Sequence, residues 1–388
     1  MPPGYNFDYV NADALMHKFS AGPGVLVTAS GMRYRLLVLD ARSSQMSLPV
    51  LRRIRDLVAA GAIVSGARPQ DTPSLADDVN EFRRIVDEVW GAIDGVHAYG
   101  KGFVYSGRSV AEVLDALKVA PDVQYTKPEA DTQLLSVHRR LSKGDLYFVD
   151  SRASHPESLE VSFRVTGRAP ELWHADTGAI EPAAYRIEAG RTVVPLQLEP
   201  WGSVFVVFRK ATAALERALP PTVETMLGSV PGPWTVNFQP DRGAPESLQL
   251  PQLRSWSELG EAGAKYYAGT ATYQRALQAP ESWFKPGTRL WLDLGDVKNI
   301  AEVTLNGKAL GVSWKAPFRV DITTALHPGD NALQINVTNL WVNRLIGDRQ
   351  ADASRQYTFA VPKFYKADSP LLPSGLIGPV SVVAEGAP

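Results

Sequence analysis

The chain has 388 residues, of which 45% are hydrophobic and 21% charged, so it can bury a sizeable core and is not expected to be disordered. Its 40 Lys and Arg residues balance 41 Asp and Glu residues, and the net charge of -1 disfavours a broadly basic protein that binds nucleic acid. The chain contains no cysteine, which excludes a disulfide framework, a thiolate metal site and a cysteine nucleophile.

The first ten residues, MPPGYNFDYV, lack both the basic and the apolar region of a signal peptide. No run of about 18 apolar residues occurs anywhere in the chain. The sequence therefore predicts no membrane span and shows no export signal, and the compartment stays unknown.

Residues 1–125 alternate between strand and helix patterns. Apolar runs at 34–40, 62–65 and 101–106 are typical of short buried strands. Helices are expected after Ser47, Ser74 and Ser109. The buried face of the second helix is predicted to consist of Leu75, Val79, Phe82, Val86, Val89 and Ile93. Such a series favours a small parallel sheet with helices on its faces.

Short alternating segments replace the helical period after residue 125. Residues 126–210 are expected to form one β-sandwich, with strands at 145–150, 159–165, 192–198 and 203–208. A linker at 211–231 follows, beginning with a helical connector at 211–219. Residues 232–388 are expected to form a second sandwich, in which Asn306-Gly307 fits a type I′ hairpin turn.

Motifs for several common chemistries are missing from the sequence. We find no phosphate-binding loop, dinucleotide fingerprint, serine elbow or zincin motif. The six histidines show no spacing typical of metal ligands. We therefore predict neither a metal site nor a cofactor.

One segment of the second sandwich carries a specific resemblance. VTLNGK at 303–308, APFRVDIT at 316–323, PGDN at 328–331 and IGPVSV at 377–382 follow one another in order. This series resembles the galactose-binding-like (jelly-roll) β-sandwich of glycoside hydrolase family 2 and its relatives. The resemblance implies a module that is often structural and in other cases contacts carbohydrate.

The order of the remaining segments resembles the region after the catalytic barrel in the α-L-rhamnosidases of glycoside hydrolase family 106. The matching segments are FDYVNADAL at 7–15, GMRYRLLVLD at 31–40, LPVLRRIRDLVAAGAIVSGARP at 48–69, VHRRLSKGDLYFVDS at 137–151 and ELWHADTG at 171–178. The first elements also look like the flavodoxin-like, amidotransferase-like α/β domain that follows the barrel in several glycosidases. Without cysteine, the amidotransferase reaction is ruled out for this chain.

The resemblance also implies what the chain lacks. Family 106 enzymes resemble other glycosidases in using two carboxylates on a (β/α)₈ barrel, and such a barrel needs about 250 residues. The α/β part is much shorter, so we expect no barrel and assign no catalytic residue. The resemblance implies a parent enzyme that is periplasmic or secreted, with the barrel as part of the parent chain or as a separate subunit.

Two clusters are candidates for contact with sugar, because saccharide sites combine an aromatic face with planar amide, carboxylate or guanidinium groups. The first comprises Asn339, Trp341, Asn343, Arg344 and Asp348. If the preceding strand continued, Asn339, Trp341 and Asn343 would share one of its faces. The alternative is that Trp341 is core and that Arg344 pairs with Asp348.

The second candidate cluster contains His138, Arg139 and Arg140, together with Asp150 and Arg152. Neighbouring residues of a strand point to opposite faces, so one or two of these side chains can line a pocket. The alternative is that they are solvated charges or charges between domains.

Three functions compete at this stage. The chain is either the non-catalytic C-terminal portion of a family 106 type rhamnosidase, or a free-standing carbohydrate-binding protein that uses the last sandwich. The third alternative is a structural module that docks onto a separately encoded barrel, which predicts a large exposed apolar patch on the α/β domain.

Overall fold

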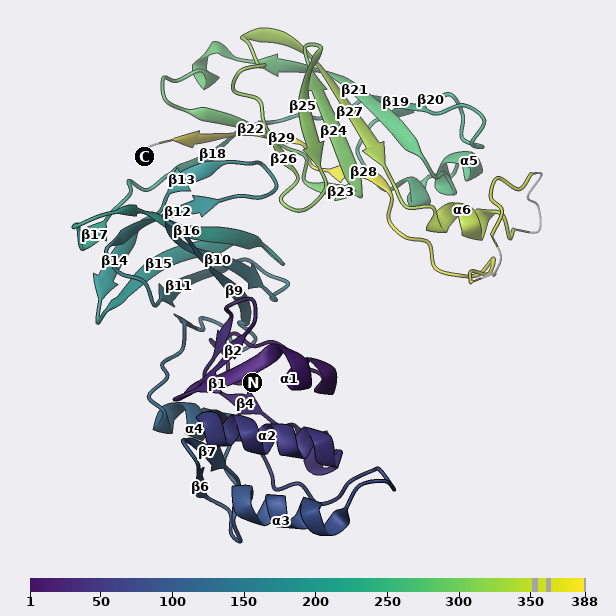
Figure 1. Ribbon diagram of the computed structural model, residues 1–388. Helices are drawn as coiled ribbons and strands as arrows, with labels where there is room; N and C mark the ends of the chain where they lie inside the picture. The colour runs from purple at the N-terminus through teal and green to yellow at the C-terminus, as the bar shows by residue number, and fades with distance from the viewer. Residues whose placement is uncertain (351–354, 361–363, 387–388) are drawn as a thin grey trace. The chain divides into compact units, whose positions relative to one another are not determined.

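The computed structural model describes residues 1–350, 355–360 and 364–386, and it forms two compact units, Met1–Arg217 and Ala218–Pro388. The chain is mostly β and contains several separate sheets (Figure 1). Among the described residues, no helix is long and apolar enough to cross a bilayer.

The first unit begins with the predicted α/β part. Its sheet has the order β4-β5-β7-β6, in which β4, β5 and β7 are parallel and β6 is antiparallel. The parallel strands agree with the alternating pattern of the sequence. The elements are β4 (Leu37–Val38), α2 (Leu48–Ala60), β5 (Ile63–Ser65), α3 (Val79–Trp90), β6 (Val96–Tyr99), β7 (Gly102–Tyr105) and α4 (Val110–Ala116).

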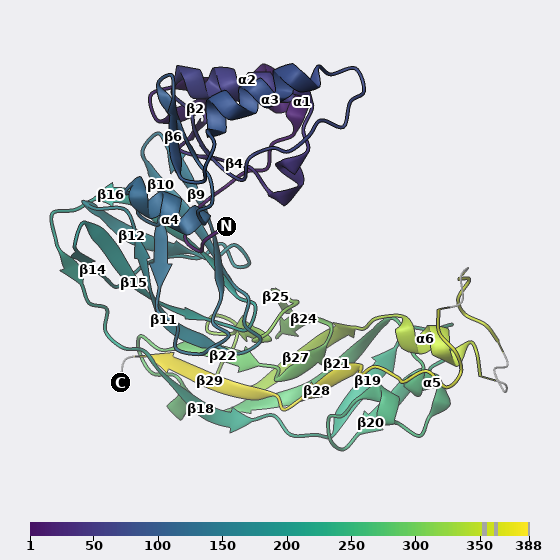
Figure 2. The same cartoon turned by 90° about the horizontal axis from the view of Figure 1, so that it is seen from below.

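Helices cover both faces of this small sheet. Val64 and Val104 belong to the core that also contains the apolar stripes of α2 and α3, which contact each other and lie side by side in both views (Figures 1 and 2). Ile63 points to the other face and packs with Val113 of α4. The period-two alternation of β5 therefore builds two apolar layers from one strand.

Two expectations in this part are corrected by the structure. The second helix begins at Val79 rather than after Ser74, because the Asp78 carboxylate accepts hydrogen bonds from the backbone N–H groups of two first-turn residues. Leu75 precedes the helix and Ile93 follows its end at Trp90, and both are exposed, at 107% and 85%. Val79, the first helical residue, is 41% exposed and also lies outside the buried face.

The expected strand at 34–40 is two strands, β3 (Arg33–Tyr34) and β4. β3 joins a small antiparallel sheet with β1 (Phe19–Gly22) and β2 (Val25–Thr28), which follow α1 (Ala12–Lys18).

The rest of the first unit is a β-sandwich of two antiparallel five-stranded sheets around Tyr147, Phe163 and Phe208. One sheet has the order β13-β12-β16-β10-β9 and the other β17-β14-β15-β11-β8. Its strands are β8 (Val123–Tyr125), β9 (Leu134–Leu141), β10 (Gly144–Ser151), β11 (Glu157–Phe163), β12 (Arg168–Trp173), β13 (Ile180–Pro182), β14 (Tyr185–Glu188), β15 (Arg191–Leu198), β16 (Ser203–Ala211) and β17 (Glu216–Arg217).

The helical connector predicted at 211–219 is absent. Ala211 ends β16, and Glu216–Arg217 pairs with β14 as an edge strand. The backbone N–H of Ile187 donates to the carbonyl of Leu215, so the open edge of β14 supplies hydrogen bonds that outweigh the helix propensity of this alanine-rich stretch.

The second unit is another sandwich, built on a four-stranded sheet, β18-β29-β22-β26, and a six-stranded sheet, β20-β19-β21-β27-β24-β25. Trp234, Trp256 and Tyr273 are fully buried in its core. Its elements are β18 (Val223–Ser229), β19 (Trp234–Phe238), β20 (Ser247–Leu250), α5 (Ala262–Lys265), β21 (Thr270–Ala279), β22 (Arg289–Asp293), β23 (Asp296–Lys298), β24 (Ile300–Leu305), β25 (Lys308–Ser313), β26 (Arg319–Asp321), β27 (Gly329–Thr338), α6 (Val342–Gly347), β28 (Gly375–Gly378) and β29 (Ser381–Gly386).

The predicted hairpin turn joins β24 to β25. Asn306 and Gly307 have φ values of 53° and 79°, the positive values that a type I′ turn requires at both central positions.

Candidate functional site

The segment from Asn339 to Asp348 does not continue the preceding strand. β27 ends at Thr338, and helix α6 begins at Val342. Asn339, Trp341 and Asn343 therefore do not share a strand face, contrary to expectation. The helix instead turns Asn343, Arg344 and Asp348 inward, at 2%, 7% and 5% exposure.

The two asparagines bind the protein's own backbone. Asn343 accepts a hydrogen bond from the N–H of Leu372 at 2.8 Å and donates to the carbonyl of the same residue at 2.7 Å. Asn339 accepts from the N–H of Gly269 at 3.0 Å and donates to the carbonyl of Tyr267 at 2.8 Å. Both amides therefore hold neighbouring loops in place.

Arg344 and Asp348 form the ion pair that the sequence offered as an alternative to a sugar site. Arg344 Nε lies 2.9 Å from Asp348 Oδ1, and the guanidinium stacks 4.8 Å from the ring centroid of Tyr357. Asp348 Oδ2 accepts hydrogen bonds from the N–H of Tyr357 and from both the N–H and the hydroxyl of Thr358. This pair fastens the segment 355–360 to the helix.

Trp341 differs from the other members of this cluster because its side chain faces outward. It is 67% exposed, so it does not belong to the core. The neighbouring Leu340 is 50% exposed. The start of α6 thus carries apolar surface that is open to a ligand or a partner.

The second candidate cluster centres on a histidine held between two carboxylates. His138 Nδ1 lies 2.7 Å from Asp122 Oδ2, and Nε2 lies 3.0 Å from Asp145 Oδ1. The imidazole also stacks on Tyr147, with ring centroids 4.0 Å apart. Arg164 pairs with Asp122 at 3.1 Å. Both ring nitrogens therefore have carboxylate partners.

The surrounding charges shift the pKa values of this cluster. Burial lowers the pKa of His138, but the hydrogen bonds and charges of Asp122 and Asp145 outweigh it and raise the pKa above its ordinary value. Burial raises the pKa of Asp122, but His138 and Arg164 hold it below its ordinary value. The imidazolium is stabilised by the fold and is suited to a structural role.

The other basic residues of this cluster are placed differently. Arg140 is on the same face of β9 as His138, with Nε 3.9 Å from Asp145, but its side chain is 86% exposed. Arg152 pairs with Asp150 at 3.5 Å, away from the histidine. Within the part of the chain that the structure describes, no three or more His, Asp and Glu side chains are grouped to hold a metal ion.

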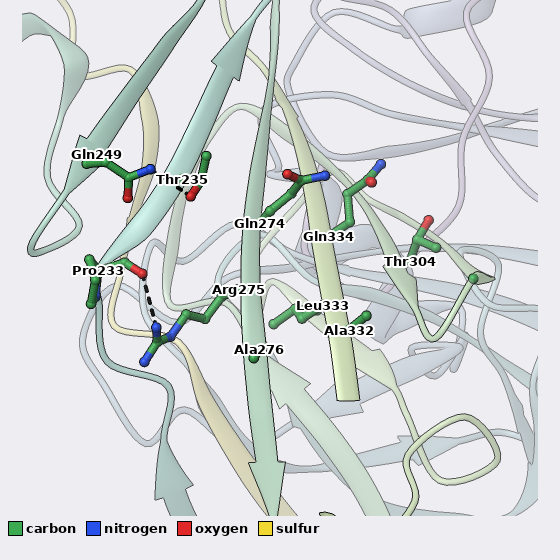
Figure 3. A pocket seen from close by; sticks show the side chains of 11 residues that line it. Pro233, Thr235, Gln249, Gln274, Arg275, Ala276, Thr304, Ala332, Leu333 and Gln334 are labelled. Atoms are coloured by element: carbon green, nitrogen blue, oxygen red, sulfur yellow. Dashed lines mark hydrogen bonds between the residues drawn. The ribbon is translucent and has the colours of Figure 1, made fainter. Parts of the chain in front are cut away.

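A groove that the sequence did not single out lies on the six-stranded sheet of the second unit. It has a volume of about 550 Å³ and runs across five strands (Figure 3). Five of its eleven lining residues are glutamine or threonine. Its lining residues are Pro233, Thr235, Gln249, Gln274, Arg275, Ala276, Thr304, Gly307, Ala332, Leu333 and Gln334. A signal for it was present in the sequence, where Thr, Gln and Asn recur at every second position of 270–274 and 334–338.

Comparison with known proteins gives two family matches. Residues 1–187 match the glycoside hydrolase family 106 description, alpha-L-rhamnosidase. Residues 260–365 match the glycosyl hydrolase 2 galactose-binding domain-like family.

One solved relative, a rhamnosidase, agrees with the first of these matches, and two β-glucuronidases are also similar to the chain or to a part of it. The rhamnosidase from Novosphingobium sp. PP1Y is 42% identical, with a TM-score of 0.86 over 99% of this chain and 36% of the rhamnosidase chain. A protein of Formosa agariphila, provisionally named a β-glucuronidase, is 23% identical over 98% of this chain and 53% of its own length. A Ruminococcus gnavus β-glucuronidase is 19% identical over 44% of this chain and 30% of its own, with a TM-score of 0.31.

The chain thus spans about half the length of the curated relative and about a third of the rhamnosidase. These findings show that the chain is related to the α-L-rhamnosidases of glycoside hydrolase family 106 and contains a galactose-binding-like domain of the glycosyl hydrolase 2 type.

Proposed function

We propose that the chain is the non-catalytic C-terminal portion of an α-L-rhamnosidase-like glycoside hydrolase, and that it supports a catalytic barrel. The observation that carries the proposal is the alignment with the Novosphingobium rhamnosidase, which uses 99% of this chain but 36% of the enzyme. In the parent, water would attack the anomeric carbon of a rhamnoside between two barrel carboxylates. This chain would buttress that barrel and shape its rim.

The surroundings of the buried acids support a non-catalytic role. Glycosidases place two carboxylates on opposite sides of the sugar, about 5–10 Å apart. Asp122, Glu171 and Asp348 are instead engaged by His138, by Arg209 and Lys210, and by Arg344, respectively. The fourth buried acid among the described residues, Glu157, accepts a hydrogen bond from the hydroxyl of Ser151 at 2.8 Å. The groove on the six-stranded sheet has no carboxylate among its lining residues.

Hydrolysis of an aryl α-L-rhamnoside tests the proposal. The purified chain is expected to release no more aryl alcohol than a heat-denatured sample of the same protein. Robust turnover that follows the folded protein through purification would overturn the non-catalytic assignment.

The proposal extends to the arrangement of domains and partners. We infer that residues 1–125 are a reduced flavodoxin-like domain, since three parallel strands carry helices on both faces. The barrel, in the same parent chain or as a separate subunit, would contact exposed apolar side chains. Phe7 and Tyr9, which are in edge-to-face contact at 5.5 Å, are candidates in this part, with Tyr9 93% exposed.

A second candidate function is carbohydrate binding by the free chain, and the exposure of Trp341 favours it. An indole with 67% of its surface open can cover the apolar face of a pyranose. Asn343, Arg344 and Asp348 would then act by holding the α6 region in shape rather than by touching sugar.

Calorimetric titration with rhamnose-containing oligosaccharides tests this second candidate. Trp341→Ala should abolish the heat of binding. Trp314→Ala is the matched control, since Trp314 is 58% exposed in the same sandwich and belongs to neither cluster. Equal loss of heat in both variants, or no heat at millimolar sugar, would count against it.

A further inference from the structure

A row of five neutral polar residues crosses the outer face of the six-stranded sheet. The strand register pairs each residue directly with the next, in the order Gln249, Thr235, Gln274, Gln334 and Thr304. Strands lie about 4.8 Å apart, so the row is about 19 Å long. The five side chains project from β20, β19, β21, β27 and β24, and Figure 3 shows the Gln274 and Gln334 amides beside each other.

The row borders a hollow because the next cross-strand pair is small. Ala276 and Ala332 are directly paired on β21 and β27, and both are exposed. Methyl groups at these two positions leave the groove of about 550 Å³ where longer side chains would fill the surface. The outer face of an antiparallel sheet is ordinarily a solvated surface, but here it has a defined depression.

The amides in the row are held by neighbours and keep unused hydrogen-bonding groups. Gln249 donates to the hydroxyl of Thr235 at 2.9 Å, Gln274 accepts from Asn237 at 3.3 Å, and Gln334 donates to Asn336 at 3.3 Å. Within the described residues, Gln249 Oε1, Gln274 Nε2 and Gln334 Oε1 have no protein partner. Two acceptors and one donor are therefore available on side chains that are already positioned.

We propose that this row and its hollow bind a neutral oligosaccharide. A hydroxyl group both donates and accepts, so adjacent sugar hydroxyls can satisfy the mixture of amide and hydroxyl groups in the row. The length of the row suits a short chain of sugar units rather than a single monosaccharide. The inference concerns binding alone, and it does not depend on the proposed support of a catalytic barrel.

A ligand that carries several charges would leave most of them without a partner in the groove, and an unpaired charge is costly to desolvate. Arg275 is the one lining residue that ionises, and its guanidinium donates to the carbonyl of Pro233 at 3.3 Å. No aromatic side chain lines the groove, so the sugar ring gains no stacking there. We therefore expect binding that is weak, in the millimolar range, and selective for uncharged sugars.

The proposal is tested by adding oligosaccharides to the full chain and monitoring its amide resonances by NMR. The probes are neutral cello-, xylo-, manno- and rhamno-oligosaccharides, with oligogalacturonate as the charged comparison. At least one neutral probe is expected to shift amide resonances of Gln274 and Gln334, and oligogalacturonate is not. Absence of shifts with every neutral probe at millimolar concentration would overturn the proposal, as would equal binding of the charged one.

Variants locate the binding face. Gln274→Leu combined with Gln334→Leu should weaken binding about tenfold, equivalent to about 1.4 kcal/mol. Gln278→Leu is the matched control, because Gln278 is also exposed on the outer face of β21 but does not line the groove. If the double variant misfolds, Gln274→Asn replaces it in the test. This variant keeps an amide but places it farther from the groove, so it should also weaken binding.

Two further outcomes would refute this placement. One is binding that survives the double variant but is lost in Trp341→Ala, which would move the sugar site to the start of α6. The other is binding weakened as much by Gln278→Leu as by the groove variants. Neither result bears on the proposal that the chain supports a catalytic barrel, because the rhamnoside assay tests that proposal separately.

Discussion

Replacing Asp122 with asparagine removes one of the two carboxylates that hold His138 but keeps the size of the side chain. The Asp122 carboxylate accepts hydrogen bonds from His138 at 2.7 Å and from Tyr147 at 3.3 Å, and 6% of the residue is exposed. A hydrogen bond to a charged group contributes about 1.5–3 kcal/mol, and breaking a buried ion pair costs about 3–5 kcal/mol. Because Asp145 still holds the second ring nitrogen and Arg164 is half-exposed, we expect a loss of about 3 kcal/mol.

The loss should depend on pH in a defined direction. The pKa of His138 is raised above 6.5, so its contribution to stability is complete below pH 6.5 and is lost as the pH rises through the pKa of the folded state. The pKa of Asp122 is lowered below 3.8, so its contribution is present above pH 3.8 and is lost as the pH falls through its folded value. The difference between wild type and Asp122→Asn should therefore be largest between pH 3.8 and pH 6.5 and shrink in alkali.

Urea unfolding at about pH 5.5 and about pH 9 measures this difference. At the lower pH, the expected loss corresponds to a fall in melting temperature of about 6–12 °C for a unit of this size. Asp131→Asn is the matched control, since Asp131 pairs with His155 on the exposed surface of the same sandwich and should change little. A difference that is the same at both pH values, or no larger than that of the control, would refute the reasoning.

Three further changes test local features of the fold. Asn343→Ala removes two buried hydrogen bonds to the main chain of a neighbouring loop and should lower the free energy of unfolding by about 2–3 kcal/mol in urea titrations. Gly295→Ala would bring a Cβ within 2.4 Å of a backbone carbon, so we expect little folded protein by circular dichroism. Gly307→Ala shares the strain of a positive φ but meets no atom within 4 Å, so it should still fold. Asp78→Ala removes the cap of α3 and should cost about 1 kcal/mol in thermal melts, and Ser74→Ala should not.

The sequence predicted elements best where one strong local signal decided the outcome. Helix α2 begins directly after Ser47, as expected, and the Asn306-Gly307 turn has the expected backbone. The start of α3 was misplaced because Ser74 and Asp78 are both good capping residues, and periodicity alone does not choose between them. The stretch 211–219 was misassigned because strand pairing depends on a distant edge that a local pattern does not contain.

The candidate sites were harder to predict, because side-chain type does not reveal which way a residue faces. The sequence grouped Trp341 with Asn343 and Asp348 as if a strand continued through them. Helix α6 instead turns Asn343 and Asp348 inward and leaves the indole of Trp341 exposed. His138 was identified, but Asp122 was not, since the two are 16 residues apart and meet only when the sandwich forms.

The groove on the six-stranded sheet shows why register matters more than composition for such a surface. Its five polar residues extend from position 235 to 334, and no two are neighbours in sequence. A shift of one residue in the pairing of β21 would replace Gln274 with the buried Tyr273 or with Arg275 and would destroy the row. The same alternation that buries Tyr273 and Ile335 in the core therefore holds the amides at the surface, so the packing of the core specifies the alignment on which the proposed sugar site depends.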